Sequence, residues 1–268
     1  MLKDITLGQY FPGNSPVHRL DPRTKLLALL TYIIALFCAK SWIGYGLLLL
    51  LLLTAIRVSQ IPGKAIVRGM KPLAMILVFT GILNLFFNRE GKILFQVLGI
   101  VITSGGVQRA SFMVVRILML VSGTFLLTYT TSPISLTDGL ESLMSPLKKL
   151  HMPVHELSMM MCIALRFIPT LIEETDKIMS AQKARGADFE NGSLMDRARA
   201  LIPILVPLFI SAFRRADELA TAMECRCYHG GEGRTKLHVL QYERRDYIAL
   251  TIGVLVLAAV LVLRFFGI

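Results

Sequence analysis

Long apolar runs alternate with polar segments along the whole chain. The five clearest runs cover residues 26–39, 42–56, 73–87, 112–131 and 247–266. A helix that crosses a bilayer needs about 20 apolar residues, so the first three runs must recruit flanking residues or lie in a thinned membrane. The pattern predicts an all-α membrane protein with about five transmembrane helices.

Composition and charge strengthen this prediction. With 54% hydrophobic residues and a mean hydropathy of +0.61, the chain is too apolar for a soluble domain. The net charge of +11 comes mainly from Lys and Arg that lie before the first run, after the second, and between the fourth and fifth. Because such residues stay in the cytoplasm during insertion, we expect a multi-pass protein of the cell (plasma) membrane with a cytoplasmic N-terminus. The lipid bilayer thus accounts for the charge, and nucleic acid is not expected as a partner.

The cysteines and the first residues indicate whether disulfides and a signal peptide are expected. The four cysteines form no evenly spaced framework, and Cys38 and Cys162 fall inside apolar stretches, so disulfides are not expected. Residues 1–21 show no basic start followed by an apolar run and a cleavage site, so no removable signal peptide is expected there.

The pattern divides the chain into three parts. Residues 1–131 hold four spans, residues 132–246 form a cytoplasmic helical region, and residues 247–268 form the final transmembrane helix. A cytoplasmic segment of this length is unusual in a protein that otherwise consists of spans. We therefore expect residues 132–246 to carry the function.

Three helices are predicted within this cytoplasmic region. Leucines at helical spacing indicate the first helix, with Ser135 and Asp138 as an N-terminal capping pair and a break before Pro153. The second runs from about 154 to 185, and the third from about 194 or 200 to 226. Their first halves are apolar nearly all round, which predicts partial embedding in the membrane, and the alternative is that both helices are additional spans.

The second and third helices end in similar ways. The two endings are Ala184-Arg185-Gly186 and Cys225-Arg226-Cys227. An arginine at an exposed helix C-terminus can enter a groove and bind a carboxylate through two parallel hydrogen bonds, which lysine cannot do. Spacing alone favours a simpler interpretation, in which each arginine compensates a helix dipole for about 0.3–1 kcal/mol.

The residue after each arginine affects how its helix ends. Gly186 can adopt the left-handed conformation that closes a helix, whereas Cys227 does so at greater cost. An ending at Gly230 is therefore the alternative for the third helix.

Several motifs along the chain resemble those of one protein family. They are Leu20-Asp21-Pro22-Arg23-Thr24-Lys25-Leu26, Asp138-Gly139-Leu140-Glu141, Ser145-Pro146-Leu147, Ala164-Leu165-Arg166-Phe167-Ile168-Pro169 and Arg214-Arg215-Ala216-Asp217-Glu218-Leu219-Ala220. With them the chain resembles the transmembrane T component of energy-coupling factor transporters, a class of prokaryotic ABC importers. Physically, Asp21 can cap a helix whose first position is Pro22.

The resemblance implies a function and a set of partners. Residues 132–246 would be coupling helices, and Arg185 and Arg226 would enter grooves on two ABC ATPase subunits. This chain would link ATP hydrolysis by those subunits to reorientation of a separate substrate-binding membrane subunit, the S component, for vitamin or micronutrient uptake. A dedicated cobalt or nickel permease is the alternative, and a membrane enzyme is a remote one. The family commonly has Ala and Gly around the second arginine, where this chain has Cys225 and Cys227.

The resemblance also assigns contacts and cofactors. Apolar residues of the coupling helices would contact the S component or one another: Leu157, Met160, Met161, Leu205, Phe209, Ala212 and Ala216. The chain has no Gly-x-x-x-x-Gly-Lys-Ser/Thr loop to hold nucleotide phosphates, so we expect no enzymatic activity and no cofactor in it. ATP and Mg²⁺ would be bound by the partner ATPases.

Five other positions have possible roles. Cys225, Cys227 and His229 suggest metal binding only weakly, because residues two apart on a helix point in different directions. His155 is expected to be solvated or interfacial. Arg116 lies inside the fourth run, where a charge is costly, so we expect it to contact another helix or subunit or to be shielded within the bundle.

Overall fold

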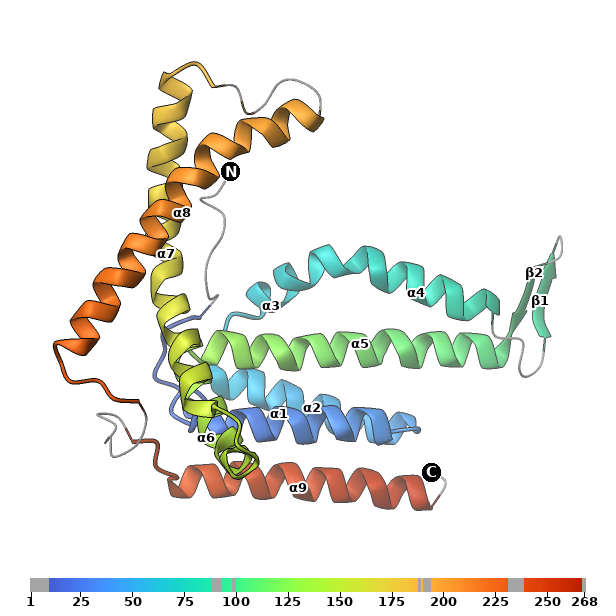
Figure 1. The fold of residues 1–268 in the computed structure, drawn as a ribbon. Helices are drawn as coiled ribbons and strands as arrows, with labels where there is room; N and C mark the ends of the chain where they lie inside the picture. The colour runs from blue at the N-terminus through green and yellow to red at the C-terminus, as the bar shows by residue number, and fades with distance from the viewer. Residues whose placement is uncertain are drawn as a thin grey trace. The chain divides into compact units, whose positions relative to one another are not determined.

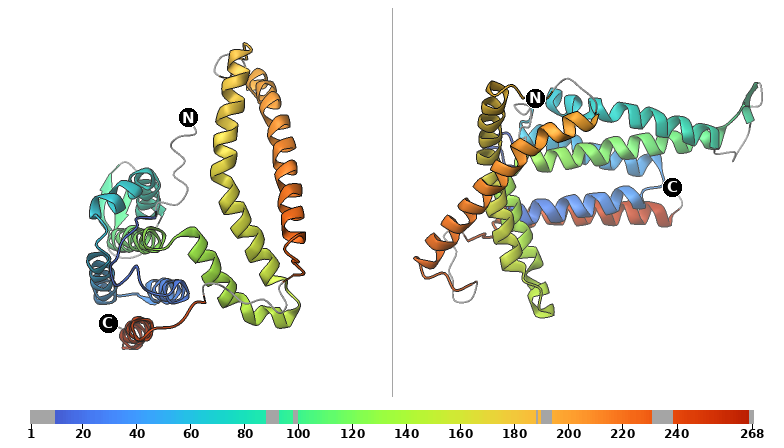
Figure 2. Two further views of the ribbon diagram at one scale, coloured as in Figure 1. Left: turned by 90° about the vertical axis from the view of Figure 1, so that its left-hand side faces the viewer. Right: turned by 45° about the horizontal axis from the view of Figure 1, so that its top comes forward.

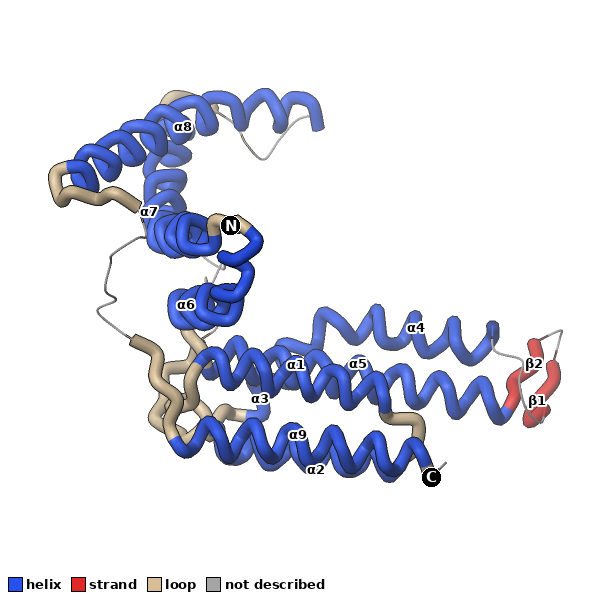
Figure 3. Tube along the Cα trace, turned by 60° about the horizontal axis from the view of Figure 1, so that its bottom comes forward, coloured by secondary structure: helices blue, strands red, loops and turns tan. Residues whose placement is uncertain are grey.

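The computed structural model describes residues 10–87, 93–97, 100–187, 189, 194–230 and 239–266. Apart from one short hairpin, the regular structure in these residues is helical (Figures 1 and 3). The contacts divide the chain into two compact units. The first, which we call the bundle, lies within Gly8–Gly139 and Leu240–Ile268, and the second, the helix-pair unit, lies mainly within Leu140–Val239.

The elements follow one another in a simple order. The bundle contains α1 (Pro22–Cys38), α2 (Trp42–Ser59), α3 (Gly63–Met70), a 3₁₀ turn (Lys71–Leu73), α4 (Ala74–Phe87), β1 (Ile93–Val97), β2 (Ile100–Thr103), α5 (Ser104–Thr130) and α9 (Arg244–Phe265). Helix α6 (Pro133–Met144) leads out of the bundle. The helix-pair unit contains a 3₁₀ segment (Ser145–Leu150), α7 (Val154–Ala184) and α8 (Leu194–Glu224).

Five helical segments among the described residues are long and apolar enough to cross a membrane. They are α2, the α3–α4 segment Gly63–Phe87, α5, α7 and α9. This confirms the prediction of an all-α membrane protein with about five candidate spans. These five differ from the predicted spans in one helix. Helix α1, which has only 17 residues, is not among them, and α7 is.

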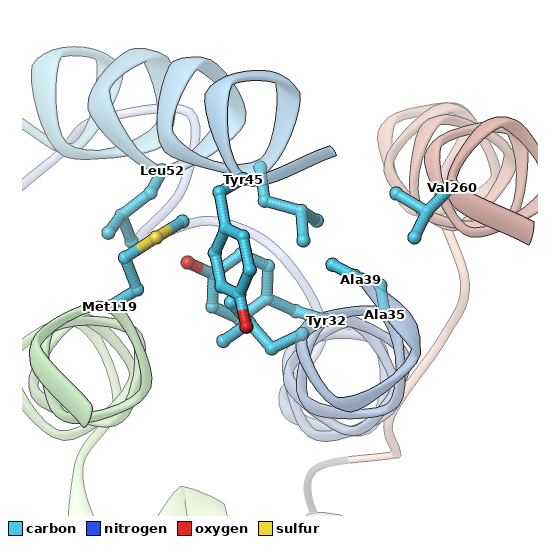
Figure 4. Packing of buried hydrophobic residues seen from close by; sticks show 9 residues of the cluster. Tyr32, Ala35, Ala39, Tyr45, Leu52, Met119 and Val260 are labelled. Atoms are coloured by element: carbon cyan, nitrogen blue, oxygen red, sulfur yellow. The ribbon is translucent and has the colours of Figure 1, made fainter. Parts of the chain in front are cut away.

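Helix α1 lies at the centre of the bundle. Its residues Tyr32, Ala35 and Leu36 are buried, and Leu36 is fully enclosed. They pack in one cluster with residues of α2, α5 and α9, namely Tyr45, Leu48, Leu52, Met119 and Val260 (Figure 4). Small residues at Ala35 and Ala39 let α9 approach α1 closely, as small residues do between membrane helices.

The third and fourth spans begin earlier than predicted. Helix α3 starts at Gly63, ten residues before the predicted start at 73, and Pro72 converts the junction with α4 into a 3₁₀ turn because it lacks a backbone N–H. Helix α5 starts at Ser104 rather than near 112, and the hydroxyl of Thr103 accepts the N–H of Gly106 at 3.1 Å to cap it. Polar residues in these first turns concealed both starts from an analysis of apolar runs.

The hairpin between α4 and α5 was not predicted. Strands β1 and β2 pair antiparallel, with Ile93 opposite Thr103 and an irregularity between Ile93 and Phe95. Strands of five and four residues are too short for a clear alternating pattern. The hairpin brings the chain directly into the first turn of α5.

A buried carboxylate joins the first turns of α1 and α9. Asp246 is 1% exposed, and its two oxygens accept the backbone N–H groups of Asp21 at 2.9 Å and of Glu243 at 2.8 Å. Asp21 in turn caps α1 by accepting the N–H of Arg23 at 2.8 Å, which confirms the predicted cap before Pro22. The α1 and α9 helices therefore start together and share one set of hydrogen bonds.

Two basic residues of the same motif complete this cluster. The guanidinium of Arg23 pairs with Asp21 at 2.8 Å and lies 4.1 Å from the ring centroid of Tyr242. The Lys25 ammonium donates to the carbonyl oxygens of His18 at 3.1 Å and Thr130 at 2.8 Å. The motif at residues 20–26 thus connects α1 to the end of α5 and to the start of α9.

Helix α6 begins at Pro133, directly after its capping residue Ser132. The hydroxyl of Ser132 accepts the N–H of Ser135 at 3.1 Å, so Ser132 is the capping residue, and the predicted pair of Ser135 and Asp138 is wrong. Pro133 at the first position favours this start. Gly139 packs against the start of α1, where an added Cβ would lie 2.9 Å from the Cβ of Pro22.

Replacing Asp246 with alanine should destabilise the bundle. The change leaves the buried N–H of Asp21 and the partly buried N–H of Glu243 without an acceptor, which costs about 2–4 kcal/mol in total. We expect a lower thermal unfolding midpoint of the full-length protein in detergent. Asp217→Ala removes an exposed carboxylate from α8 and serves as the control, with little expected effect. Equal unfolding midpoints for the two variants would contradict the role of Asp246.

Candidate functional site

Helices α7 and α8 form an antiparallel pair (Figures 1 and 2). Arg215 donates to Glu174 at 2.9 Å, and the Ser211 hydroxyl donates to the same carboxylate. The contact from Gln182 to the carbonyl of Pro203, at 3.4 Å, lies nearer the end of α7. As residue numbers rise along α7, those of their partners fall along α8, so each helix ends beside the other's first half.

Helix α7 ends in a left-handed glycine directly after Arg185. Gly186 has a φ of +88°, and its N–H donates to the carbonyl of Lys183 at 3.0 Å. The N–H of Ala187 donates back to the carbonyl of Gln182, also at 3.0 Å. This pair of bonds satisfies carbonyls at the helix end and closes it abruptly. Arg185 is consequently the last residue before the chain turns away.

The end of α8 repeats this arrangement. Cys227 has a φ of +57°, its N–H donates to the carbonyl of Glu224 at 2.8 Å, and the N–H of Tyr228 donates to Met223 at 3.1 Å. The alternative ending at Gly230 is therefore wrong, and α8 closes at the cysteine. A left-handed conformation costs a residue with a Cβ about 1–2 kcal/mol, and the two closing hydrogen bonds offset part of it.

Both arginines are exposed in this chain, as are the residues beside them: Ala184, Gly186, Cys225 and Cys227. Within the described residues, neither guanidinium forms an ion pair with an acidic side chain. Because the paired helices are antiparallel, Arg185 and Arg226 lie near opposite ends of the pair. At 1.5 Å per residue over some 25 residues, their separation is on the order of 40 Å.

The apolar residues predicted to contact a partner lie mostly on exposed faces. Leu157, Met160 and Met161 of α7 are exposed, as are Leu205, Phe209 and Ala216 of α8, whereas Ala212 is half-buried. The contact between the two helices instead includes the polar group Glu174, Ser211 and Arg215, which the sequence analysis missed. In the sequence, the only indication of this contact was a carboxylate in the predicted second helix and a hydroxyl and a guanidinium in the third. Exposed apolar side chains thus remain on both helices of the isolated chain.

The structure also shows the surroundings of the other positions for which the sequence suggested a role. His155 is half-buried and lies 3.2 Å from Glu141, so it lies where α7 meets α6, which is the interfacial one of its two expected positions. Arg116 donates from Nε to the Tyr45 hydroxyl at 2.8 Å, which confirms contact with another helix. Within the described part of the chain, Cys225, Cys227 and His229 are not grouped as a metal site.

Comparisons with known proteins cover nearly the whole chain. The family model for the cobalt transport protein CbiQ matches residues 13–237. The chain is 52% identical over 265 residues to the energy-coupling factor transporter transmembrane protein EcfT of Acidaminococcus fermentans, covering 99% of this chain and 97% of that protein. It is 50% identical over 267 residues to the protein of that name from Ruminiclostridium cellulolyticum, covering 99% of each. The corresponding identity for the Bacillus subtilis protein is 47% over 261 residues, covering 97% of this chain and 98% of that protein.

Substitutions at Cys227 should change the stability of the α8 end. Cys227→Gly removes the left-handed strain and should slow amide hydrogen exchange over residues 219–230, by about fivefold for ~1 kcal/mol. Cys227→Val places a β-branched residue at positive φ and should speed exchange. Cys225→Ala also removes a thiol but lies outside the left-handed position, so it should leave exchange unchanged. A change of similar size in that control would exclude backbone strain as the cause.

Proposed function

The chain belongs to the family of transmembrane T components of energy-coupling factor transporters, and we propose that it couples two partner ATPases to a substrate-binding S component. ATP and Mg²⁺ are bound by the ATPases in this mechanism, and this chain supplies the mechanical link. Its bundle lies in the bilayer with the N-terminus on the cytoplasmic side. The observation that carries the proposal is the repeated helix ending at Arg185 and Arg226.

The geometry of these endings supports docking to two separate subunits. In each ending the helix stops at an exposed arginine, and a left-handed residue turns the chain sharply away. This leaves the guanidinium at a blunt helix end that a groove can enclose. Inside such a groove, a carboxylate can accept two parallel hydrogen bonds from it. A separation on the order of 40 Å is too large for one groove to bind both arginines.

The contact between α7 and α8 can pass movement from one helix to the other. The Glu174 carboxylate binds Ser211 and Arg215 at once, so it holds the two helices in one register. When ATP binding brings the ATPases together, movement at one arginine is transmitted across this contact to the other helix. The two helices thus move as a linked pair rather than as independent rods.

The open apolar surface is the proposed contact for the S component. Met160 and Met161 are flexible and polarisable, so they can repack against different partner side chains. Leu205 and Phe209 offer larger exposed apolar side chains on α8. Rearrangement of this surface under ATP control would change the orientation of the S component in the membrane, which delivers its bound vitamin or micronutrient.

A dedicated cobalt permease is the second candidate, favoured by the description of the matching family model. The names of the similar relatives specify no substrate. Both candidates assign this chain the same mechanical role and differ in the S component that it contacts. Mass spectrometry of the native complex would separate them by the identity of that subunit.

Charge reversal at the arginines should abolish assembly with the ATPases. For Arg185→Glu or Arg226→Glu alone, loss of one desolvated ion pair and repulsion of its partner should cost at least 2–5 kcal/mol, roughly a thirtyfold or greater loss of affinity. The double variant should not co-purify with the ATPases, although its membrane insertion should be normal. Arg214→Glu makes the same charge change at an exposed position within α8 and is the matched control.

Lysine substitutions test the geometry of the contact. Arg185→Lys and Arg226→Lys keep the charge but lose the planar pair of donors, so each should weaken co-purification less than the glutamate change does. Unchanged complex yield in the double glutamate variant would refute docking through these arginines. Equal loss in Arg214→Glu would attribute the effect to general surface charge.

A further inference from the structure

A cavity with polar and apolar lining residues lies at the end of the bundle where α1 ends and α5 begins. It has a volume of about 720 Å³. Three cationic side chains line it: Lys40 after α1, and Arg109 and Arg116 on α5. The amide side chains of Asn84 and Gln108 also line it, and no acidic residue is among the described residues that do so.

The position of Arg116 makes this cavity more than a basic surface. Its Nε donates to Tyr45 at 2.8 Å, and its guanidinium carbon lies 5.5 Å from the ring centroid of Phe37 and 5.9 Å from that of Tyr45. These contacts hold the group in place but neutralise none of its charge. A cation inside a membrane span is costly unless a counter-charge or water reaches it.

The start of α5 adds to the positive potential. Ser104 and Gly105, the first two residues of this 27-residue helix, line the cavity. The dipole of a helix favours negative charge near its first residues, and in this helix the N–H of Gly106 is already bound by Thr103. The cations and the helix start therefore favour the same kind of ligand, an anion with several acceptor oxygens.

An aromatic pair indicates where the membrane surface lies. Trp42 is exposed, and its ring centroid lies 4.4 Å from that of Phe112. Trp is enriched where lipid head groups meet the hydrocarbon core. Arg116 lies one helical turn, about 6 Å, beyond Phe112, while Arg109 lies nearly one turn on the other side. The two α5 cations thus lie on either side of the level at which lipid phosphates and glycerol groups are found.

We infer that this cavity binds a phosphate-bearing anion, the head group of an anionic phospholipid in the leaflet at this end of the bundle. The exposed ring of Phe37, 59% accessible beside Arg116, offers an apolar surface to the acyl chains. A free anion would make no use of that surface, and the lipid is therefore the favoured source of the phosphate. This inference is independent of the proposed coupling role, because all the residues involved belong to the bundle.

Trp42 provides a direct test, because it is the only tryptophan in the chain. The full-length protein is reconstituted in vesicles that contain phosphatidylglycerol or phosphatidylcholine with brominated acyl chains, and quenching of its fluorescence is measured. We expect a preference for phosphatidylglycerol of about 25-fold, since the two α5 cations contribute roughly fivefold each. Arg116→Gln and Arg109→Gln should each reduce the preference by about fivefold.

The controls separate a built site from general charge. Arg264→Gln removes an exposed cation near the end of α9, at the same end of the bundle but outside the cavity, and should keep the preference. If Arg116→Gln does not fold, Arg109→Gln carries the test, because Arg109 has an exposed side chain.

Three results would overturn the inference. The first is equal quenching of the unmodified protein by the two lipids. The second is a loss of preference in Arg264→Gln as large as that in Arg116→Gln. The third is displacement of phosphatidylglycerol by inorganic phosphate at constant ionic strength, which would identify a free anion as the ligand.

Discussion

The carboxylate of Asp246 is the interaction on which the bundle depends. It is buried, yet it accepts hydrogen bonds from the backbone just before α1 and from the residue that caps α9. A bilayer offers no water to unsatisfied backbone groups, so helix starts near it must find acceptors within the protein. With α1 held in this way at the centre, its buried face can pack against α2, α5 and α9. Gly139 then lets α6 leave the bundle in close contact with the first turn of α1.

The helix-pair unit solves a different physical problem. In the proposed mechanism, its helices present their ends to partner ATPases while they hold each other in register. Left-handed residues after Arg185 and Arg226 terminate both helices at their arginines, and the Glu174 carboxylate holds the helices together between these ends. Polar bonds rather than apolar packing fix part of this contact, which leaves apolar side chains available for a partner.

The opposite end of the bundle from Asp246 gathers several basic side chains around one cavity. The Asp246 end contains the ion pair of Arg23 with Asp21, whereas the cavity near Lys40 gathers cations without a described acid among its lining residues. The bundle thus has an ion pair at one end and the proposed phospholipid site at the other. A phospholipid bound there would complete the packing of the bundle as an additional component.

The sequence by itself determined the features that depend on neighbouring residues. Apolar runs predicted the membrane class, Asp21-Pro22 predicted the start of α1, and Arg185-Gly186 predicted the end of α7, because spacing and local backbone preference decide these. Only the tertiary structure decided which partners distant groups would find. Asp246 meets Asp21 across 225 residues, and Arg116 meets Tyr45 across 71, and no local pattern encodes either pairing. Cys227 adopts a left-handed conformation that its side chain disfavours, because the bonds that close α8 compensate the strain. Local preference therefore specifies where helices begin and end, and the free energy of long-range packing selects what their side chains contact.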